Sequence, residues 1–65
     1  MNGYIEVETA HNQKLLINTM YISELISNDS GQTIIVLNNG SQYTLTNTYS
    51  DIKYRLFDIG RPMTL

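Results

Sequence analysis

Residues 33–45 read TIIVLNNGSQYTL, and this stretch decides the fold. Residues 33–37 form a continuous apolar, β-branched run, whereas residues 41–46 alternate between polar and apolar side chains. Asn39-Gly40 stands between them, and the tolerance of both residues for positive φ is typical of tight β-hairpin turns. The stretch therefore predicts two antiparallel strands joined at Asn39-Gly40, and we interpret this pair as a turn rather than a ligand site.

Two registers of this hairpin fit the sequence. A two-residue loop would pair Asn38 with Ser41 and would place one set of side chains on a common face: Ile34, Val36, Tyr43 and Leu45. A three-residue loop with Gly40 in a bulge would pair Leu37 with Ser41 and would place a different set together: Ile35, Leu37, Tyr43 and Leu45. In either register two large aliphatic side chains of the first strand lie on the opposite, more polar face, where something must cover them.

Three further strands are expected before this hairpin. Ile5, Val7 and Thr9 alternate with glutamates, which is the pattern of a half-buried strand, and residues 14–17 follow a short polar break as its partner. Residues 21–27 are ambiguous, because their apolar positions also fit a helical stripe. Their β-branched residues and their short length favour a strand, which would end at the turn-forming segment 28–31.

The pattern changes to that of a helix after residue 46. Thr48 and Asp51 form a capping box, in which Thr48 would accept a hydrogen bond from the backbone and Asp51 would reach back. Apolar residues then recur at spacings of three and four along one stripe: Tyr49, Ile52, Leu56 and Ile59. Gly60 is a plausible stop signal, and Pro62 cannot continue the helix.

Together these elements predict an α+β fold in one domain that covers residues 1–65. A small antiparallel sheet, a β-meander of four to five strands, is expected over residues 4–46. One C-terminal α-helix over residues 48–59 would lie on this sheet, and residues 60–65 would form a tail.

The small size of the chain predicts a homo-oligomer. A domain of 65 residues buries only about 60 % of its unfolded surface, so its core is marginal unless a disulfide, a metal or oligomerisation stabilises it. The sequence has no cysteine and one histidine, which leaves oligomerisation. Because one helix covers only one face of a small sheet, we expect the interface with a second copy or a protein partner on the apolar strand: Ile34, Ile35, Val36 and Leu37.

Charge and hydropathy exclude several classes of partner. A net charge of −2 and a pI near 5.0 argue against nucleic-acid binding, which requires a basic face. No apolar run is long enough to span a membrane, and residues 1–8 lack the basic and apolar regions of a signal peptide. The expected location is therefore the cytoplasm, which the absence of cysteine also fits.

No motif for catalysis, a cofactor or a metal is present, so we expect a protein that is not an enzyme. Glu6 and Glu8 share one face of a strand and His11 lies in a turn, and solvated side chains are the simpler interpretation of all three. Five tyrosines suit core packing or a binding surface. The candidate contacts for an anionic ligand lie near the C-terminus: Lys53, Tyr54, Arg55 and Arg61.

The order of these motifs resembles the small FlbD/SwrD-like family associated with flagella and swarming, or a phage or accessory-genome relative of that shape. The resemblance rests on residues 5–7, 15–18, 33–40, Ile22, Tyr43 and the helix that begins after Thr48. It implies a β-meander that ends in a capped helix, and it implies no catalytic residue. The chain departs from the family at His11-Asn12, where an Asn-Gly turn is usual, and at Tyr49, where a proline usually follows the cap.

Two functions remain open from the sequence. The first is a non-enzymatic, oligomeric module for protein–protein interaction. The alternative is a phage-type inhibitor or sponge that binds a small anionic, nucleotide-like ligand at a subunit interface.

Overall fold

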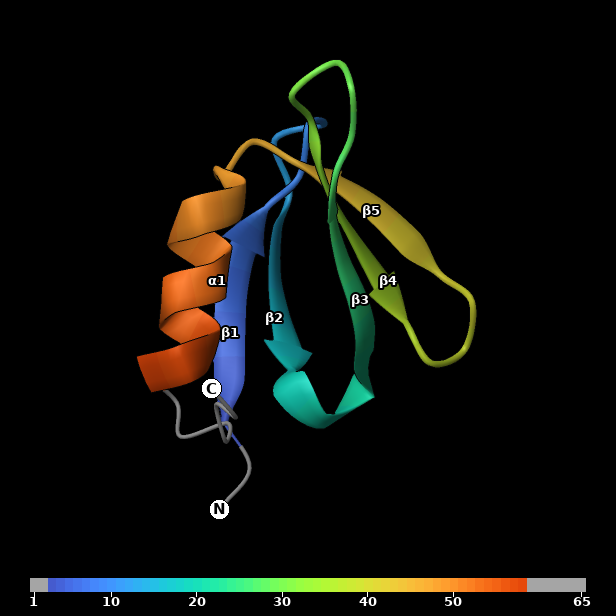
Figure 1. The fold of residues 1–65 in the computed structure, drawn as a ribbon. Helices are drawn as coiled ribbons and strands as arrows, with labels where there is room; N and C mark the ends of the chain where they lie inside the picture. Colours follow the sequence, from blue (N-terminus) through green and yellow to red (C-terminus); the bar gives the residue numbers. More distant parts are fainter. Residues whose placement is uncertain (1–2, 59–65) are drawn as a thin grey trace.

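A computed structural model describes residues 3–58 of the chain (Figure 1). In chain order the elements are β1 (Tyr4–Glu8), β2 (Lys14–Asn18), the 3₁₀ turn η1 (Thr19–Tyr21), β3 (Ile22–Ser27), β4 (Thr33–Leu37), β5 (Gln42–Leu45) and α1 (Tyr49–Asp58). The predicted α+β class, with antiparallel strands in meander order followed by one helix, is confirmed. The predicted tail and the predicted helix stop at Gly60 and Pro62 lie outside the described residues.

The five strands form two sheets, where the sequence predicted one. β1 pairs with β2, and β3, β4 and β5 form a second antiparallel sheet in that order. The chain turns between the sheets at η1, where the Asn18 side chain accepts a hydrogen bond from the Met20 backbone N–H at 3.0 Å. This turn separates β3 from β2, so β3 pairs only with β4 among the described strands. The ambiguous segment 21–27 is thus a strand from residue 22 onward.

The β4–β5 hairpin adopts the three-residue loop. Ile35 lies opposite Tyr43 and Thr33 lies opposite Leu45. The Leu37 N–H donates to the Ser41 carbonyl and the Gly40 N–H donates to the Leu37 carbonyl, both at 2.9 Å. Gly40 has a φ of +91°, the conformation that a glycine bulge requires. Of the two registers that the sequence allowed, the bulged one is therefore correct.

This register assigns the two faces of β4. Ile35 is fully buried, and Leu37 and Tyr43 are half-buried against the core. Ile34 and Val36 lie on the opposite face, outside the core cluster. Every described strand and the helix contribute to that core: Ile5, Val7, Ile17, Ile22, Ile35, Leu45, Ile52 and Leu56.

A short seam joins the two sheets where the end of β1 meets the end of β5. Thr9 forms an isolated antiparallel bridge with Leu45. The Ala10 N–H donates to the Thr44 carbonyl at 2.9 Å, and the Thr46 N–H donates to the Glu8 carbonyl at 2.8 Å. The seam closes the sheets around one core, which α1 covers from the side of β1 and β3 (Figure 1).

The helix begins as the capping pattern predicted, with one difference. The Asp51 N–H donates to the Thr48 hydroxyl at 3.1 Å, which confirms Thr48 as the cap. The Asp51 carboxylate, however, forms an ion pair with Arg55 one turn ahead at 3.1 Å instead of reaching back. Ile52 and Leu56 are buried, as the stripe predicted, while Ile59 lies outside the described residues.

The Gly40 conformation yields a test of the hairpin. A Cβ at Gly40 would meet no atom within 4 Å, so Gly40→Ala adds backbone strain without a clash. We expect a loss of about 1–2 kcal/mol in the free energy of unfolding, measured by urea denaturation. Gly40→Asn should lose less, because asparagine tolerates positive φ better than alanine. Equal losses in the two variants would contradict the bulged turn.

Candidate interaction surfaces

Glu6, Glu8 and His11 are the side chains that the sequence offered for acid–base chemistry. Glu6 and His11 are exposed, and the Glu8 carboxylate accepts a hydrogen bond from the Thr46 hydroxyl at 3.4 Å. Within residues 3–58, no three His, Asp or Glu side chains come together in a group that could hold a metal ion. The surfaces that remain to be considered are mainly apolar.

The first candidate surface is the outer face of the β3–β4–β5 sheet. The register aligns its residues in two rows across the strands, one of Ile26, Ile34 and Thr44 and the other of Glu24, Val36 and Gln42. Ile26 is 36 % exposed, and Ile34, Val36 and Thr44 are half-buried. The face is therefore apolar along β4 and more polar toward Glu24 and Gln42.

Two of the four predicted interface residues lie on this outer face and two do not. Ile34 and Val36 face outward, where a second chain can reach them. Ile35 has no exposed surface, because it fills the core of its own chain, and Leu37 packs on the edge of that core. The sequence left this division open because it depended on the register of the turn. An interface on this face stays a prediction.

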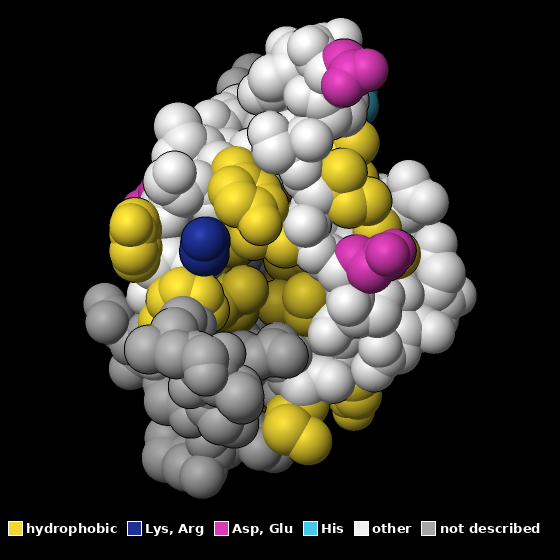
Figure 2. Space-filling model, viewed as in Figure 1, with side chains coloured by type: hydrophobic (Ala, Val, Ile, Leu, Met, Phe, Trp, Pro, Cys, Tyr) yellow, Lys and Arg dark blue, Asp and Glu magenta, His cyan; other side chains and the backbone are white. Residues whose placement is uncertain are grey.

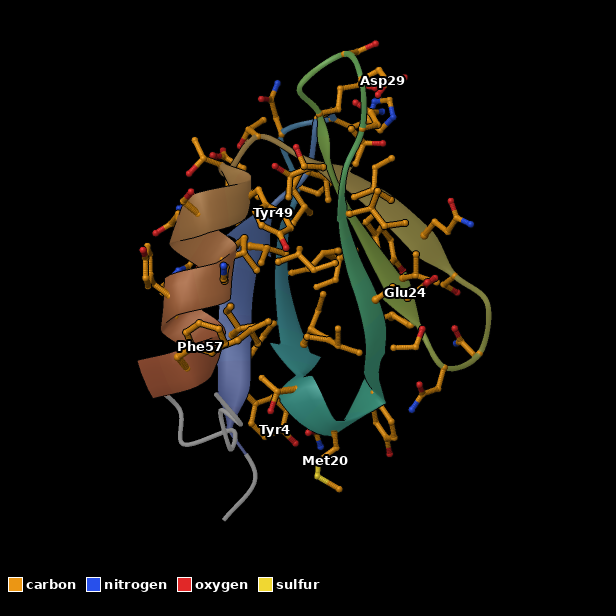
Figure 3. The ribbon with its side chains drawn as sticks, viewed as in Figure 1. Tyr4, Met20, Glu24, Asp29, Tyr49 and Phe57 are labelled. Atoms are coloured by element: carbon orange, nitrogen blue, oxygen red, sulfur yellow. The ribbon has the colours of Figure 1, made fainter. Side chains whose placement is uncertain are left out.

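A second surface surrounds a hollow of about 290 Å³ between α1 and β3. Hydrophobic side chains gather around it, with a basic side chain on the α1 side and an acidic one on the β3 side (Figure 2). Tyr49 and Phe57 lie on α1, and Glu24 lies across from them on β3 (Figure 3). Lys53 belongs to this hollow, and its Nζ lies 6.0 Å from the centre of the Phe57 ring.

The three candidate contacts for an anionic ligand that the structure describes do not converge on one site. Arg55 lies beside β1, where its Nη1 donates to the Glu6 carbonyl at 2.9 Å and its Nη2 contacts Asp51 at 3.1 Å. Lys53 lies at the separate hollow beside β3. Tyr54 is exposed and its ring packs edge-to-face on Phe57, and Arg61 lies outside the described residues. The Arg55 guanidinium thus links α1 to β1, and two of its nitrogens already have hydrogen-bond partners.

A third surface, which the sequence did not single out, is a groove at the end of the molecule that carries η1. It consists of two adjoining hollows of about 330 and 360 Å³ that share Tyr21 and Leu37. The first is lined also by Tyr4, Tyr43 and residues 15–18, and the second by Asn38 and Asn39. We call this surface the tyrosine groove. Tyr4 and Met20 lie at this end of the molecule (Figure 3).

Several large hydrophobic side chains at or beside the tyrosine groove are exposed. Tyr4, Leu16, Met20 and Tyr21 are each between 57 % and 69 % exposed. Leu16 faces outward because β2 alternates, with Ile17 buried beside it. Two signals in the sequence are consistent with this surface: an apolar residue at an outward strand position and the high number of tyrosines. The groove itself is assembled from β2, η1 and the β4–β5 turn, which only the fold brings together.

Comparison with known proteins gives no further guide to the site. No protein-family model, no curated protein and no solved structure matches this chain. The resemblance to the FlbD/SwrD-like family therefore stays a prediction from the sequence. Residues 3–58 contain no helix with the length and apolar character that a membrane crossing requires.

The bonded state of Arg55 can be tested by comparison with Lys53 on the same helix. Arg55→Ala should lower the free energy of unfolding by about 1 kcal/mol, because the Glu6 carbonyl and Asp51 lose their partner. Lys53→Ala should change it by less than about 0.5 kcal/mol, as expected for a surface side chain. Urea denaturation measures both values. Similar losses would show that Arg55 has no special role at β1.

Proposed function

We propose that this protein is a non-enzymatic interaction module that self-associates through the outer face of its β3–β4–β5 sheet. The observation that supports the proposal is a group of three apolar side chains on that face, which we call the apolar row: Ile34, its neighbour Ile26 on β3, and Val36, two residues further along β4. β4 is apolar on both faces, and the core of a single chain uses only one of them. Apolar side chains on both faces are typical of a strand that is buried on both sides.

The energetics favour association at this face. Fully burying a side chain such as Ile or Val stabilises a protein by about 1.5–3 kcal/mol, and the half-buried Ile34 and Val36 have part of this still to gain. A chain of 65 residues without a disulfide has a small core, so such a gain is large relative to its stability. Glu24 and Gln42 are exposed beside the apolar row, which corresponds to the apolar centre and polar rim of protein interfaces.

The anionic-ligand alternative has less support. Its two described basic side chains lie at separate hollows, and Arg55 is already bonded to Glu6 and Asp51. We therefore propose a binding module as the function. We propose the cytoplasm as its location, because a chain without cysteine loses no stability where disulfides do not form.

The proposed interface is tested by two lysine substitutions at outward strand positions. Ile34→Lys places a charge on the outer face and should reduce the mass in sedimentation equilibrium to that of the 7.4 kDa monomer. Leu16→Lys introduces the same charge on the other sheet and should keep the oligomeric mass of the unmodified protein. Circular dichroism verifies that both variants fold. A monomeric unmodified protein at micromolar concentration, or an oligomer that Ile34→Lys leaves intact, would contradict the proposal.

A further inference from the structure

We infer that the tyrosine groove binds an uncharged, proline-rich segment of another protein in the polyproline II conformation. This inference goes beyond self-association and does not depend on it, because the groove contains none of the six residues of the outer face. It rests on three properties of the groove: the lack of charge among its described lining residues, the aromatic lining, and two side-chain amide nitrogens without a partner among the described residues.

The part of the groove that the described residues form offers no charge to a ligand. Of the described residues that line its two hollows, none is acidic or basic. The lining is apolar or aromatic, with three tyrosines at positions 4, 21 and 43, and its remaining polar residues are asparagines. A charged ligand placed there would lose hydration without gaining an opposite charge. The ligand should therefore be neutral over the length of the groove.

The asparagines of the groove present hydrogen-bond donors. The Asn18 Oδ1 accepts from the Met20 backbone N–H at 3.0 Å, and the Asn39 Oδ1 accepts from the Ser41 backbone N–H at 2.9 Å. Because a backbone N–H only donates, the oxygen of each amide must face it and the Nδ2 group must face away. Neither Nδ2 has a partner among the described residues, whereas the Asn38 Nδ2 donates to the Met20 carbonyl at 3.2 Å.

A neutral surface of aromatic rings and amide donors fits a ligand that is rich in acceptors and poor in donors. An extended β-strand or a polar loop brings backbone N–H groups that would need acceptors in the groove. A helix has most of its carbonyls already bonded. A proline-rich segment in the polyproline II conformation has free carbonyls and few N–H groups, and its rings pack on aromatic side chains. It is also ordered before binding, so it loses little conformational entropy.

The test titrates the full chain, labelled with ¹⁵N, with an N-acetylated and C-amidated decaproline. We expect chemical-shift changes at Tyr21, Leu37 and the Asn39 side-chain amide, and none at Ile34. A Gly/Ser decapeptide of equal length and a neutral cello-oligosaccharide serve as comparison ligands and should cause no such shifts. No shifts with decaproline at millimolar concentration, equal shifts with the Gly/Ser peptide, or shifts with the oligosaccharide alone would overturn the inference.

Matched variants separate the groove from the rest of the surface. Tyr21→Ala should weaken decaproline binding by about tenfold or more, as expected for an aromatic contact residue. Tyr54→Ala removes a tyrosine on α1 that is 65 % exposed, compared with 60 % for Tyr21, and should leave binding unchanged. Ile34→Lys should also leave it unchanged, which separates the groove from the proposed oligomer interface. Loss of binding in Tyr54→Ala, or full binding in Tyr21→Ala, would overturn the inference.

The donor argument has a test of its own. Asn39→Asp keeps an oxygen that accepts from the Ser41 N–H but replaces the outward donor with an acceptor. The turn should be retained, as judged by the amide shift of Ser41, while decaproline binding should weaken severalfold. Binding that Asn39→Asp leaves unchanged would remove the reason for a donor-poor ligand and would overturn the assignment to polyproline II.

Discussion

The seam at Thr9 and Leu45 makes one protein of two small sheets. A two-stranded sheet is at best marginally stable alone. The three-stranded sheet has its core residues on one face, and another element must pack against that face to bury them. The seam brings the inner faces of both sheets together, and the Glu8 N–H extends it by donating to the Asn47 side chain at 2.9 Å. Thr9 itself is buried, and its hydroxyl accepts from the backbone of the first turn. The helix starts at Tyr49, two residues after Asn47, so the seam lies next to the beginning of α1.

Closing the sheets in this way determines which side chains remain outside. The inner faces and α1 use Ile35, Leu45 and Ile52 in a single core, which leaves β4 with an apolar outer face. The turn at η1 leaves β2, Met20 and Tyr21 beside the β4–β5 loop, which forms the tyrosine groove. One fold thus offers an aliphatic sheet face and a neutral aromatic groove as separate surfaces.

Local patterns in the sequence predicted the strands, the Asn39-Gly40 turn and the Thr48 cap, because these depend on neighbouring residues. Contacts between distant residues could not be predicted in this way. The sequence allowed Ile34 or Ile35 in the core with equal merit, since a shift of one residue in the turn reverses the faces. The bond from Arg55 to the Glu6 carbonyl joins residues 49 positions apart, so the sequence could not show that this candidate anion contact already has a partner. Asn39 was correctly interpreted as a turn residue, but the sequence could not show that its side-chain oxygen accepts from the Ser41 N–H.

The central claim, that the outer face of β3–β4–β5 is an interface between copies of this chain, is tested most directly by a dilution series followed in methyl NMR spectra. The account predicts that the methyl resonances of Ile26, Ile34 and Val36 shift when dilution dissociates the oligomer, while those of Leu16 and the buried Ile35 stay constant. Methyl resonances that do not change from micromolar to millimolar concentration, with the tumbling rate of a 7.4 kDa monomer throughout, would contradict it.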